Sequence, residues 1–265
     1  MNRKYRIAII LLLLIGITAS NWTKIKVSGN QIATIAYWTA KNTLGFHRHV
    51  YAQVNQIDVV NLPQPQIDGV VSVEKALNNR RSRRQFQDKE VSIEDLSQIL
   101  WAAYGITLPV ADNPDFRGGF RTAPSAGALY PLEIYIAVGK VQGLEPGVYK
   151  YFPDGHKIIK VLDEDVRAQL SSAALGQEVV KEAPVSIIYA AVFARTAARY
   201  GSSRGERYVF MESGYSAENV YLQAEALGLG TVAVGAFVDA KVAGILRLPR
   251  GESPLNIMPI GHYAR

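Results

Sequence analysis

The chain has 265 residues and no cysteine, which excludes disulfide bonds, thiolate metal sites and a cysteine nucleophile. Hydrophobic residues make up 48% of it, enough for one compact domain or two small ones, so wholesale disorder is not expected. The net charge of +6 includes Arg3, Lys4 and Arg6, which leaves the rest only mildly basic and gives no reason to expect nucleic-acid binding.

The first 20 residues have the pattern of a targeting segment. Basic residues precede the apolar run 7–17, and the small residues Thr18, Ala19 and Ser20 follow it. This order is typical of a secretory signal, and the run is shorter than the roughly 20 residues that span a bilayer. We therefore predict a signal peptide or membrane anchor over residues 1–20, with membrane contact through residues 5–20 if it is not cleaved, and an exported or membrane-anchored, extracytoplasmic protein. The alternative, a buried helix, lacks the polar face such a helix needs.

Residues 21–65 are predicted to be a preamble that ends in a stiff linker, and the main domain is predicted to span residues 66–265. Residues 31–44 could form a short amphipathic helix within the preamble. The linker contains Pro63 and Pro65. Each proline fixes its own φ and moves the preceding residue out of the helical region, so we expect an extended segment here.

Two helices with side-chain caps are predicted next. Ser72 can cap the first, and Ser92 can cap the second, with Asp95 three residues later as in a capping box. Gly105 is expected to end the second helix. The positions predicted to be buried are Val73, Ala76 and Leu77 in the first helix and Leu96, Ile99, Leu100 and Ala103 in the second.

The remaining elements mix strands and helices. Because they lack the regular alternation of βαβ units, the pattern favours the α+β class. A hairpin is expected around Pro153, Asp154 and Gly155. The predicted strands are 133–138, 148–152, 157–162, 185–193, 231–234 and 256–260, and the predicted helices are 163–175, 206–227 and 240–246.

Residues 80–84, Arg-Arg-Ser-Arg-Arg, place four guanidinium groups within five positions at the end of the first predicted helix. Like charges this close repel one another unless an anion neutralises them. Arginine presents a planar fork of donors that matches phosphate oxygens, and Ser82 adds a hydroxyl donor. The cluster therefore indicates an anion clamp, with a solvated basic surface as the alternative.

Residues 122–131 are mostly small and stand before a predicted strand. Small side chains let a flat ring lie close to the backbone and bond its N–H groups, so the segment can line a cofactor; an ordinary loop is the plain alternative. A hydrolase is a sharper alternative, with Ser125 as nucleophile and His156 or His262 as base. A nucleophile elbow needs a strand before it and a helix after it, whereas a loop precedes Ser125 and a strand follows.

Two further patterns are interpreted as structural. Residues 228–233 match the letters of a dinucleotide fingerprint, but a helix precedes them and a strand follows, the reverse of the phosphate-binding order. Gly235, after that strand, could present its N–H group to a cofactor. The four histidines, at positions 47, 49, 156 and 262, lack the spacing of a helical metal pair, so no metal site is predicted.

Together these segments resemble the nitroreductase-like superfamily of FMN oxidoreductases, in particular its SagB-type dehydrogenase branch. The matching pieces span about three-quarters of the chain, and their order is more specific than any one of them. They are Leu-Pro-x-Pro at 62–65, Arg-Arg-Ser-x-Arg at 80–84, Ser-Ala-Gly-Ala-Leu-Tyr-Pro at 125–131, Gly-Val-Tyr-Lys-Tyr at 147–151 with His156, residues 214–219, and Leu-Gly-Leu-Gly at 227–230.

The resemblance implies a three-layer α+β fold, with a mostly antiparallel central sheet flanked by helices. It also implies a homodimer that binds FMN at the subunit interface. The residues it assigns to the FMN phosphate are Arg80, Arg81, Ser82 and Arg84. Those it assigns to the isoalloxazine ring are Pro124, Ser125, Ala126, Gly127 and Ala128, with Gly235 near the flavin.

The chain departs from the branch at Arg199, which precedes Tyr200. Some members oxidise azolines in peptides to azoles with a Lys-Tyr pair at this place, and arginine cannot act as a base at neutral pH. We therefore expect no azoline oxidation, and we expect Tyr200, beside Arg199, to exchange the proton that accompanies hydride transfer. The alternative is that Tyr200 packs at a helix start and Arg199 faces water. Glu218 stands where Gln is commoner in the branch.

The leading hypothesis is an FMN-dependent oxidoreductase that transfers hydride through bound flavin to or from a small organic substrate, with NADH or NADPH as a candidate donor. The flavin would carry the redox chemistry, so the lack of a catalytic cysteine or histidine is no objection. The alternative is a membrane-tethered flavin-binding protein without turnover. The sequence names neither donor nor acceptor.

Overall fold

The computed structural model describes residues 58–110 and 116–263. They belong to one compact unit, Gln56–Arg265. The predicted signal peptide or anchor, the preamble and its helix at 31–44 lie outside the described residues. Within the described ranges, no helix is both long and apolar enough to cross a bilayer.

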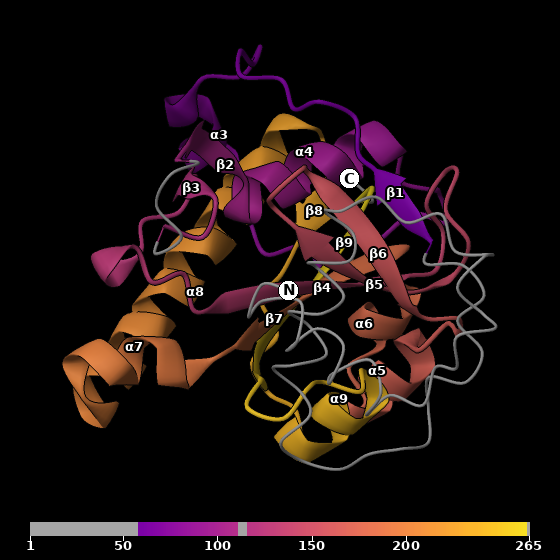
Figure 1. The fold of residues 1–265 in the computed structure, drawn as a ribbon. Helices are drawn as coiled ribbons and strands as arrows, with labels where there is room; N and C mark the ends of the chain where they lie inside the picture. The colour runs from indigo at the N-terminus through magenta and orange to yellow at the C-terminus, as the bar shows by residue number, and fades with distance from the viewer. Residues whose placement is uncertain (1–57, 111–115, 264–265) are drawn as a thin grey trace, which may run out of the picture. The chain divides into compact units, whose positions relative to one another are not determined.

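A seven-stranded sheet forms the centre of the described unit (Figure 1). Its strand order is β1-β6-β5-β4-β7-β9-β8, and every neighbouring pair is antiparallel. A separate two-stranded ribbon pairs β2 with β3. The strands are β1 (Val59–Asn61), β2 (Ile106–Pro109), β3 (Gly119–Arg121), β4 (Leu132–Val138), β5 (Gly147–Phe152), β6 (Lys157–Leu162), β7 (Val185–Ala191), β8 (Gly230–Thr231) and β9 (Ser253–Gly261).

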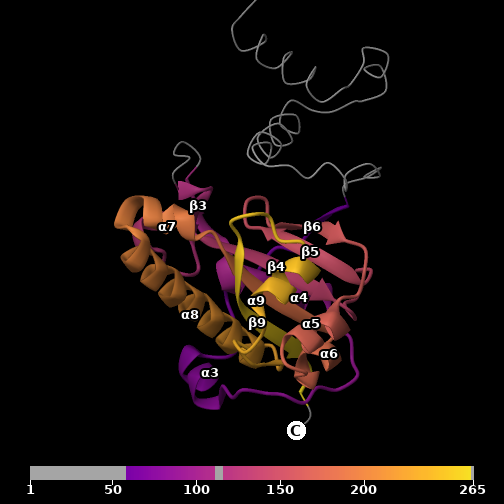
Figure 2. The same ribbon diagram turned by 90° about the horizontal axis from the view of Figure 1, so that it is seen from below.

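Helices cover both faces of the sheet, with α5, α6 and α9 on one side and α4 and α8 on the other (Figures 1 and 2). The predicted α+β class with a mostly antiparallel sheet is confirmed. The helices are α3 (Val73–Asn79), α4 (Ile93–Tyr104), α5 (Arg167–Ala173), α6 (Glu178–Glu182), α7 (Phe193–Tyr200), α8 (Ser202–Ala226) and α9 (Asp239–Ile245), with a 3₁₀ turn at Ala126–Ala128.

The central strands are apolar because both of their faces are buried. Alternate residues of a strand point to opposite faces, so one strand contributes to two cores. In β4, Ile134 and Ile136 pack with α4 and α8, whereas Tyr135 and Ala137 pack with α5, α6 and α9. This explains why 185–193 was predicted as an unbroken apolar strand.

Helix α4 confirms the predicted cap and stripe. The Ser92 side chain accepts a hydrogen bond from the Asp95 backbone N–H at 3.0 Å, and the predicted stripe is buried. The helix ends before Gly105, whose φ is −66°, so this glycine is not needed for a left-handed conformation. It is needed for space, because a Cβ there would lie 2.3 Å from a ring carbon of Trp101.

Helix α3 confirms the cap but not the buried stripe. Ser72 accepts a hydrogen bond from the Lys75 backbone N–H at 3.2 Å, as predicted. Ala76 is buried, but Val73 and Leu77 are 63% and 53% exposed, so the prediction of three buried positions was wrong. A helix of seven residues offers only a narrow contact to the protein, and here one small residue makes it.

Other predicted boundaries also change. The predicted strand 185–193 ends at Ala191, and Phe193 opens α7, which the sequence did not predict. The predicted strand 231–234 shrinks to β8 plus an isolated bridge between Val234 and Ile257. The short elements β1, β2, β3 and α6 were not predicted either, because three to five residues carry little periodicity.

The described residues just before Pro63, which were predicted to lie outside the main domain, pack against it. β1 pairs with β6, and Leu62 is buried in the core. His156, in the predicted turn, fixes this segment. Ser97 Oγ donates to the Pro63 carbonyl at 2.6 Å and so accepts from His156 Nε2 at 2.7 Å, while Tyr151 donates to Nδ1 at 2.8 Å. The boundary at residue 65 stays a prediction, since the residues before 58 lie outside the described ranges.

Glu133 is the centre of a buried ion cluster at the start of β4. Its carboxylate lies 2.9 Å from Lys150 Nζ and pairs closely with Arg195 of α7. Lys150 Nζ also lies 3.0 Å from the carboxylate of Glu252. Burial by itself raises the pKa of Glu133, but Lys150 and Arg195 outweigh it and lower the pKa to about 2. The cluster therefore ties β4, β5 and α7 together.

Glu133→Gln should destabilise the fold by about 3–5 kcal/mol near pH 7, because it leaves Arg195 without its buried carboxylate and Lys150 with Glu252 alone. The pKa of Glu133 is lower in the folded state, so its contribution is present above pH 4.5 and is lost as the pH falls through 2. Urea unfolding across pH 2 to 7 should show this acid-dependent part in the wild type and in the exposed control Glu145→Gln, but not in Glu133→Gln. Equal acid profiles would show that the pairing adds no stability.

Candidate functional site

The arginine-rich segment 80–84 runs along the C-terminal end of α8. Ser82 forms a parallel bridge with Thr231, and the Arg83 backbone N–H donates to the Thr231 carbonyl at 2.9 Å. The Ser82 and Tyr221 hydroxyls lie 3.2 Å apart, and Tyr221 OH also accepts from the Ala233 backbone N–H at 2.8 Å. The segment is therefore joined to both α8 and the residues that follow it.

The guanidinium groups of this segment are poorly neutralised by the protein. Arg80 Nε lies 3.9 Å from Glu218 Oε1, a long ion pair at the surface. Arg81 donates to the carbonyls of Asn78 and Arg80, and within the described ranges neither Arg81 nor Arg84 has an ion pair. Arginines that keep donors free at the surface are suited to a phosphate.

The small-residue loop holds an unusual backbone. Ser125 precedes a 3₁₀ turn, and Gly127 has φ 63°. Ala128 and Tyr130 have φ values of 54° and 46°, which are in the left-handed region although neither is glycine. Such residues cost free energy and persist only when the surrounding structure fixes them. Pro124 and Gly127 are exposed, and Ser125, Ala126 and Ala128 are half-buried, so the loop offers a surface to a ligand.

Arg199 and Tyr200 lie against this loop. They end α7, so Tyr200 stands at a helix end, not at the start of the long helix as the alternative had assumed. A Cβ added at Gly127 would lie 2.6 Å from the Tyr200 hydroxyl and 2.9 Å from Arg199 Nη1. The φ of 63° at Gly127 favours glycine there, and the two predicted catalytic residues lie beside a predicted ring-binding residue.

Glu212 of α8 is a site residue that the sequence analysis missed. It is 1% exposed. Ser125 Oγ donates to its carboxylate at 2.6 Å, and Tyr104 OH makes a short hydrogen bond to the other oxygen. Burial raises the pKa of Glu212 to about 7 against the opposing effect of these two hydrogen bonds. A single Glu within a long helix gave no sequence signal, because only the fold places it under the loop.

The structure thus gathers the predicted site residues into two groups along α8. Arg80, Arg81, Ser82 and Arg84 lie by its C-terminal end, close to Tyr221. The loop that contains Ser125 lies by Glu212, nine residues earlier, which is about 13 Å along a helix axis. Gly235 is exposed, and a Cβ there would meet nothing within 4 Å, so only its place two residues after Ala233 connects it with the first group.

The alternative readings gain no support from the geometry. His156 is bonded to Ser97 and Tyr151, and Ser125 has no hydrogen bond to a histidine among the described residues, so the hydrolase reading fails. Helix α8 precedes Gly230 and β8 follows, as expected for a sequence that is not a dinucleotide fingerprint. Within the described part of the chain, no group of acidic or histidine side chains could hold a metal ion.

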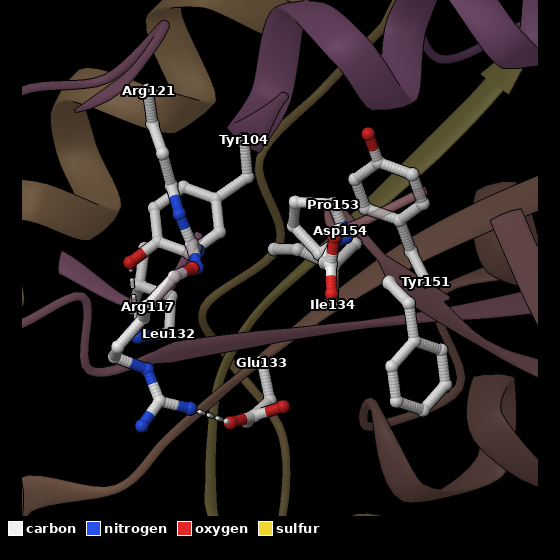
Figure 3. Close-up of a pocket in the computed structure, with 10 residues that line it drawn as sticks. Tyr104, Arg117, Arg121, Leu132, Glu133, Ile134, Tyr151, Pro153 and Asp154 are labelled. Atoms are coloured by element: carbon white, nitrogen blue, oxygen red, sulfur yellow. Dashed lines mark hydrogen bonds and ion pairs between the residues drawn. The ribbon is translucent and has the colours of Figure 1, made fainter. Parts of the chain in front are cut away.

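A cavity of about 160 Å³ is lined in part by Tyr104, the residue that bonds to Glu212 (Figure 3). The Arg121 guanidinium lies over the rings of Tyr104, at 4.2 Å, and Tyr130, at 4.4 Å. Tyr104 therefore contacts both Arg121 of the cavity and Glu212 beneath the loop. Charges of both signs and aromatic rings suit the cavity to a small polar molecule rather than to a bare anion. Its lining residues are Tyr104, Arg117, Arg121, Leu132, Glu133, Ile134, Tyr151, Phe152, Pro153 and Asp154.

Comparison with known proteins gives one consistent result. The nitroreductase family profile matches residues 77–262. A candidate nitroreductase of Methanocaldococcus jannaschii is 48% identical over 204 residues, which cover 77% of this chain and 97% of that protein. An FMN reductase [NAD(P)H] of Bacillus subtilis is 26% identical over 203 residues, covering 72% and 65%. The crystal structure of a candidate nitroreductase from Ralstonia eutropha superposes with a TM-score of 0.66 at 29% identity, covering 78% and 90%.

Glu212→Gln should change how stability depends on pH. The pKa of Glu212 is raised in the folded state, so its ionisation opposes folding, and wild-type stability should fall by about 3 kcal/mol in total as the pH rises from 4.5 to above 7. The glutamine variant should lack this fall, whereas Glu206→Gln, at an exposed position of α8, should retain it. Urea unfolding between pH 5 and 9 measures the difference. Parallel curves for Glu212→Gln and the wild type would contradict a neutral buried carboxyl.

Proposed function

The chain belongs to the nitroreductase family, and we propose that it is an FMN-dependent oxidoreductase acting on a small organic substrate. The observation that carries this proposal is the arrangement along α8. A cluster of guanidinium groups, of which those of Arg81 and Arg84 have no ion pair among the described residues, lies by one part of the helix, and an exposed loop of small residues lies by another. FMN has a phosphate at one end and a flat ring at the other, which is what these two surfaces suit.

The phosphate would be held by Arg80, Arg81, Ser82 and Arg84. Arg81 and Arg84 supply donors that no carboxylate of the described residues occupies. Charge-assisted bonds from arginine to phosphate are short and about twice as strong as neutral ones. Arg83 differs, because its guanidinium lies 4.4 Å from the ring of Tyr263. This agrees with its place at the variable position of the motif.

The ring would lie on the loop at 124–128, next to Tyr200. Bound FMN would supply the acceptor and donor of hydride, which no amino-acid side chain provides. The chain's own residues then have two tasks. The loop offers small side chains and backbone groups to the ring, and the Tyr200 hydroxyl, beside Gly127, can exchange the proton that accompanies the transfer.

The substrate class follows from residue 199 and from the relatives. Arginine in place of lysine removes a base from the site, which disfavours azoline oxidation. A 48% identical relative is named as a candidate nitroreductase, so we infer reduction of quinones or nitroaromatic compounds. NADH or NADPH is the inferred donor, as in the name of the Bacillus subtilis relative. A homodimer with FMN at its interface and an extracytoplasmic location held by residues 1–20 complete the proposal.

The double variant Arg81→Ala with Arg84→Ala should lose FMN while keeping its fold. Each charge-assisted bond contributes roughly 1.5–3 kcal/mol, so the pair should cost at least about a hundredfold in affinity. Fluorescence titration of FMN against the flavin-free protein measures this, with circular dichroism as the check on folding. Lys241→Ala with Arg250→Ala removes the same charge from other exposed positions and should bind FMN normally. A wild type that takes up no FMN would end the proposal.

Tyr200→Phe should bind FMN as the wild type does but turn over more slowly, because it lacks the hydroxyl that exchanges the proton. Steady-state reduction of a quinone or a nitroaromatic compound with NADH or NADPH measures turnover. Equal turnover in both proteins would remove Tyr200 from the mechanism. Formation of azole from a thiazoline peptide by the wild type would contradict the inference from Arg199. Failure of NADH and NADPH to bleach the flavin anaerobically would favour a flavin-binding protein without turnover.

A further inference from the structure

The loop at 124–130 is held in a costly conformation. Gly127, Ala128 and Tyr130 all have left-handed φ values within four residues. An isolated segment would relax to ordinary backbone angles, so other contacts must fix it. The hydrogen bonds that do so meet at one carboxylate, that of Glu212.

Glu212 holds the loop near both of its ends. Ser125 Oγ donates to Glu212 at 2.6 Å and accepts from the Tyr130 backbone N–H at 2.9 Å, so one hydroxyl joins the two ends of the loop to α8. The other carboxylate oxygen accepts from Tyr104 OH, which in turn accepts from the Leu132 backbone N–H at 3.3 Å. The start of β4 is fixed through this second path.

The carboxylate is not placed there for stability. Arg121 and Arg195 act on it electrostatically, but among the described residues no cation lies within ion-pair distance of it. A buried carboxyl without a paired cation costs free energy that an apolar side chain of similar size would not. A side chain that is costly for the fold and sits under a strained, exposed loop is best explained by what the loop does.

We propose that Glu212 is a positioning residue for the flavin: its two acceptor oxygens hold Ser125 and Tyr104 and thereby keep the loop in the shape that receives the isoalloxazine ring. This inference rests on the proposed function for its ligand. The clamp itself is a property of the protein without ligand and can be measured there.

The first experiment replaces Glu212 with leucine, which fills similar space but accepts no hydrogen bond. Three quantities are measured at pH 8: the urea midpoint, the FMN dissociation constant, and amide hydrogen exchange of residues 125–132 in the flavin-free protein. Glu212→Leu should unfold at no lower urea concentration than the wild type, bind FMN roughly tenfold or more weakly, and exchange the Tyr130 amide faster. Glu206→Leu, exposed on the same helix, should match the wild type in all three.

A loss of FMN affinity without a loss of stability in Glu212→Leu would distinguish a residue that positions the loop from one that only fills space. If Glu212 only filled space, leucine would restore the loop and FMN affinity would be unchanged. Glu212→Gln keeps one acceptor oxygen and should fall between the wild type and leucine. Equal affinity in all three proteins, with equal exchange at Tyr130, would overturn the proposal.

Ser125→Ala tests the same path from the loop side and serves if Glu212→Leu does not fold. It should loosen residues 125–132 by itself. In its presence Glu212→Gln should cost less FMN affinity than it costs in the wild type, since the connection to Ser125 is already broken and only that to Tyr104 remains. Additive losses would show that Glu212 acts by another route and would overturn the proposal.

The exchange measurement keeps this inference distinct from the proposed function. A wild type that binds no FMN would refute the proposed function, and the ring would then be the wrong ligand for the loop. Faster exchange at Tyr130 in Glu212→Leu and Ser125→Ala would still establish the clamp. Unchanged exchange in both variants would refute the clamp even if FMN binds.

Discussion

The packing of α8 against the sheet is the constraint on which the candidate site depends. The helix presents small and apolar side chains to the core, among them Val209, Ala217 and Val220. Ser216 Oγ donates a hydrogen bond to the Ala103 carbonyl at 2.6 Å and shares another with the Tyr189 hydroxyl at 3.0 Å, which fix α8 to α4 and β7. Every other part of the site is attached to this helix, so its position sets theirs.

Two buried glutamates show how differently the fold treats the same group. Glu133 is surrounded by Lys150 and Arg195 and stays ionised, with a pKa of about 2. Glu212 has only hydroxyl donors as direct partners, and burial raises its pKa to about 7. The first joins strands and helix and supports the fold. Glu212 lowers the stability of the fold but holds the loop in place, so its role is better explained by function than by folding.

The proposed flavin site accordingly combines strained and relaxed parts. In the guanidinium segment at 80–84 no residue has a positive φ, and the segment contributes mainly through its charge. The loop at 124–130 depends on conformation, because Ala128 and Tyr130 are held at positive φ. Holding a surface in advance lowers the ordering cost at the moment of binding, which is how a protein uses strain in recognition. The Tyr200 hydroxyl lies close to this loop, because Gly127 has no side chain to occupy the space.

The sequence by itself determined the features that are local. Ser92 and its stripe specified α4, alternation and apolar runs specified the central strands, and the order of short motifs specified the family. The arginines at 80–84 and the small residues at 124–128 could be identified as candidate site residues because their composition is unusual wherever they lie.

Only the tertiary structure decided what depends on partners distant in the chain. Leu77 has the pattern of a buried residue but finds no surface to cover it, and α7 is too short and too polar to signal itself. Glu212 was invisible for the same reason. Its partners Ser125 and Tyr104 are 87 and 108 residues away, and the free energy of a buried carboxyl is set by such contacts, which no window of sequence contains.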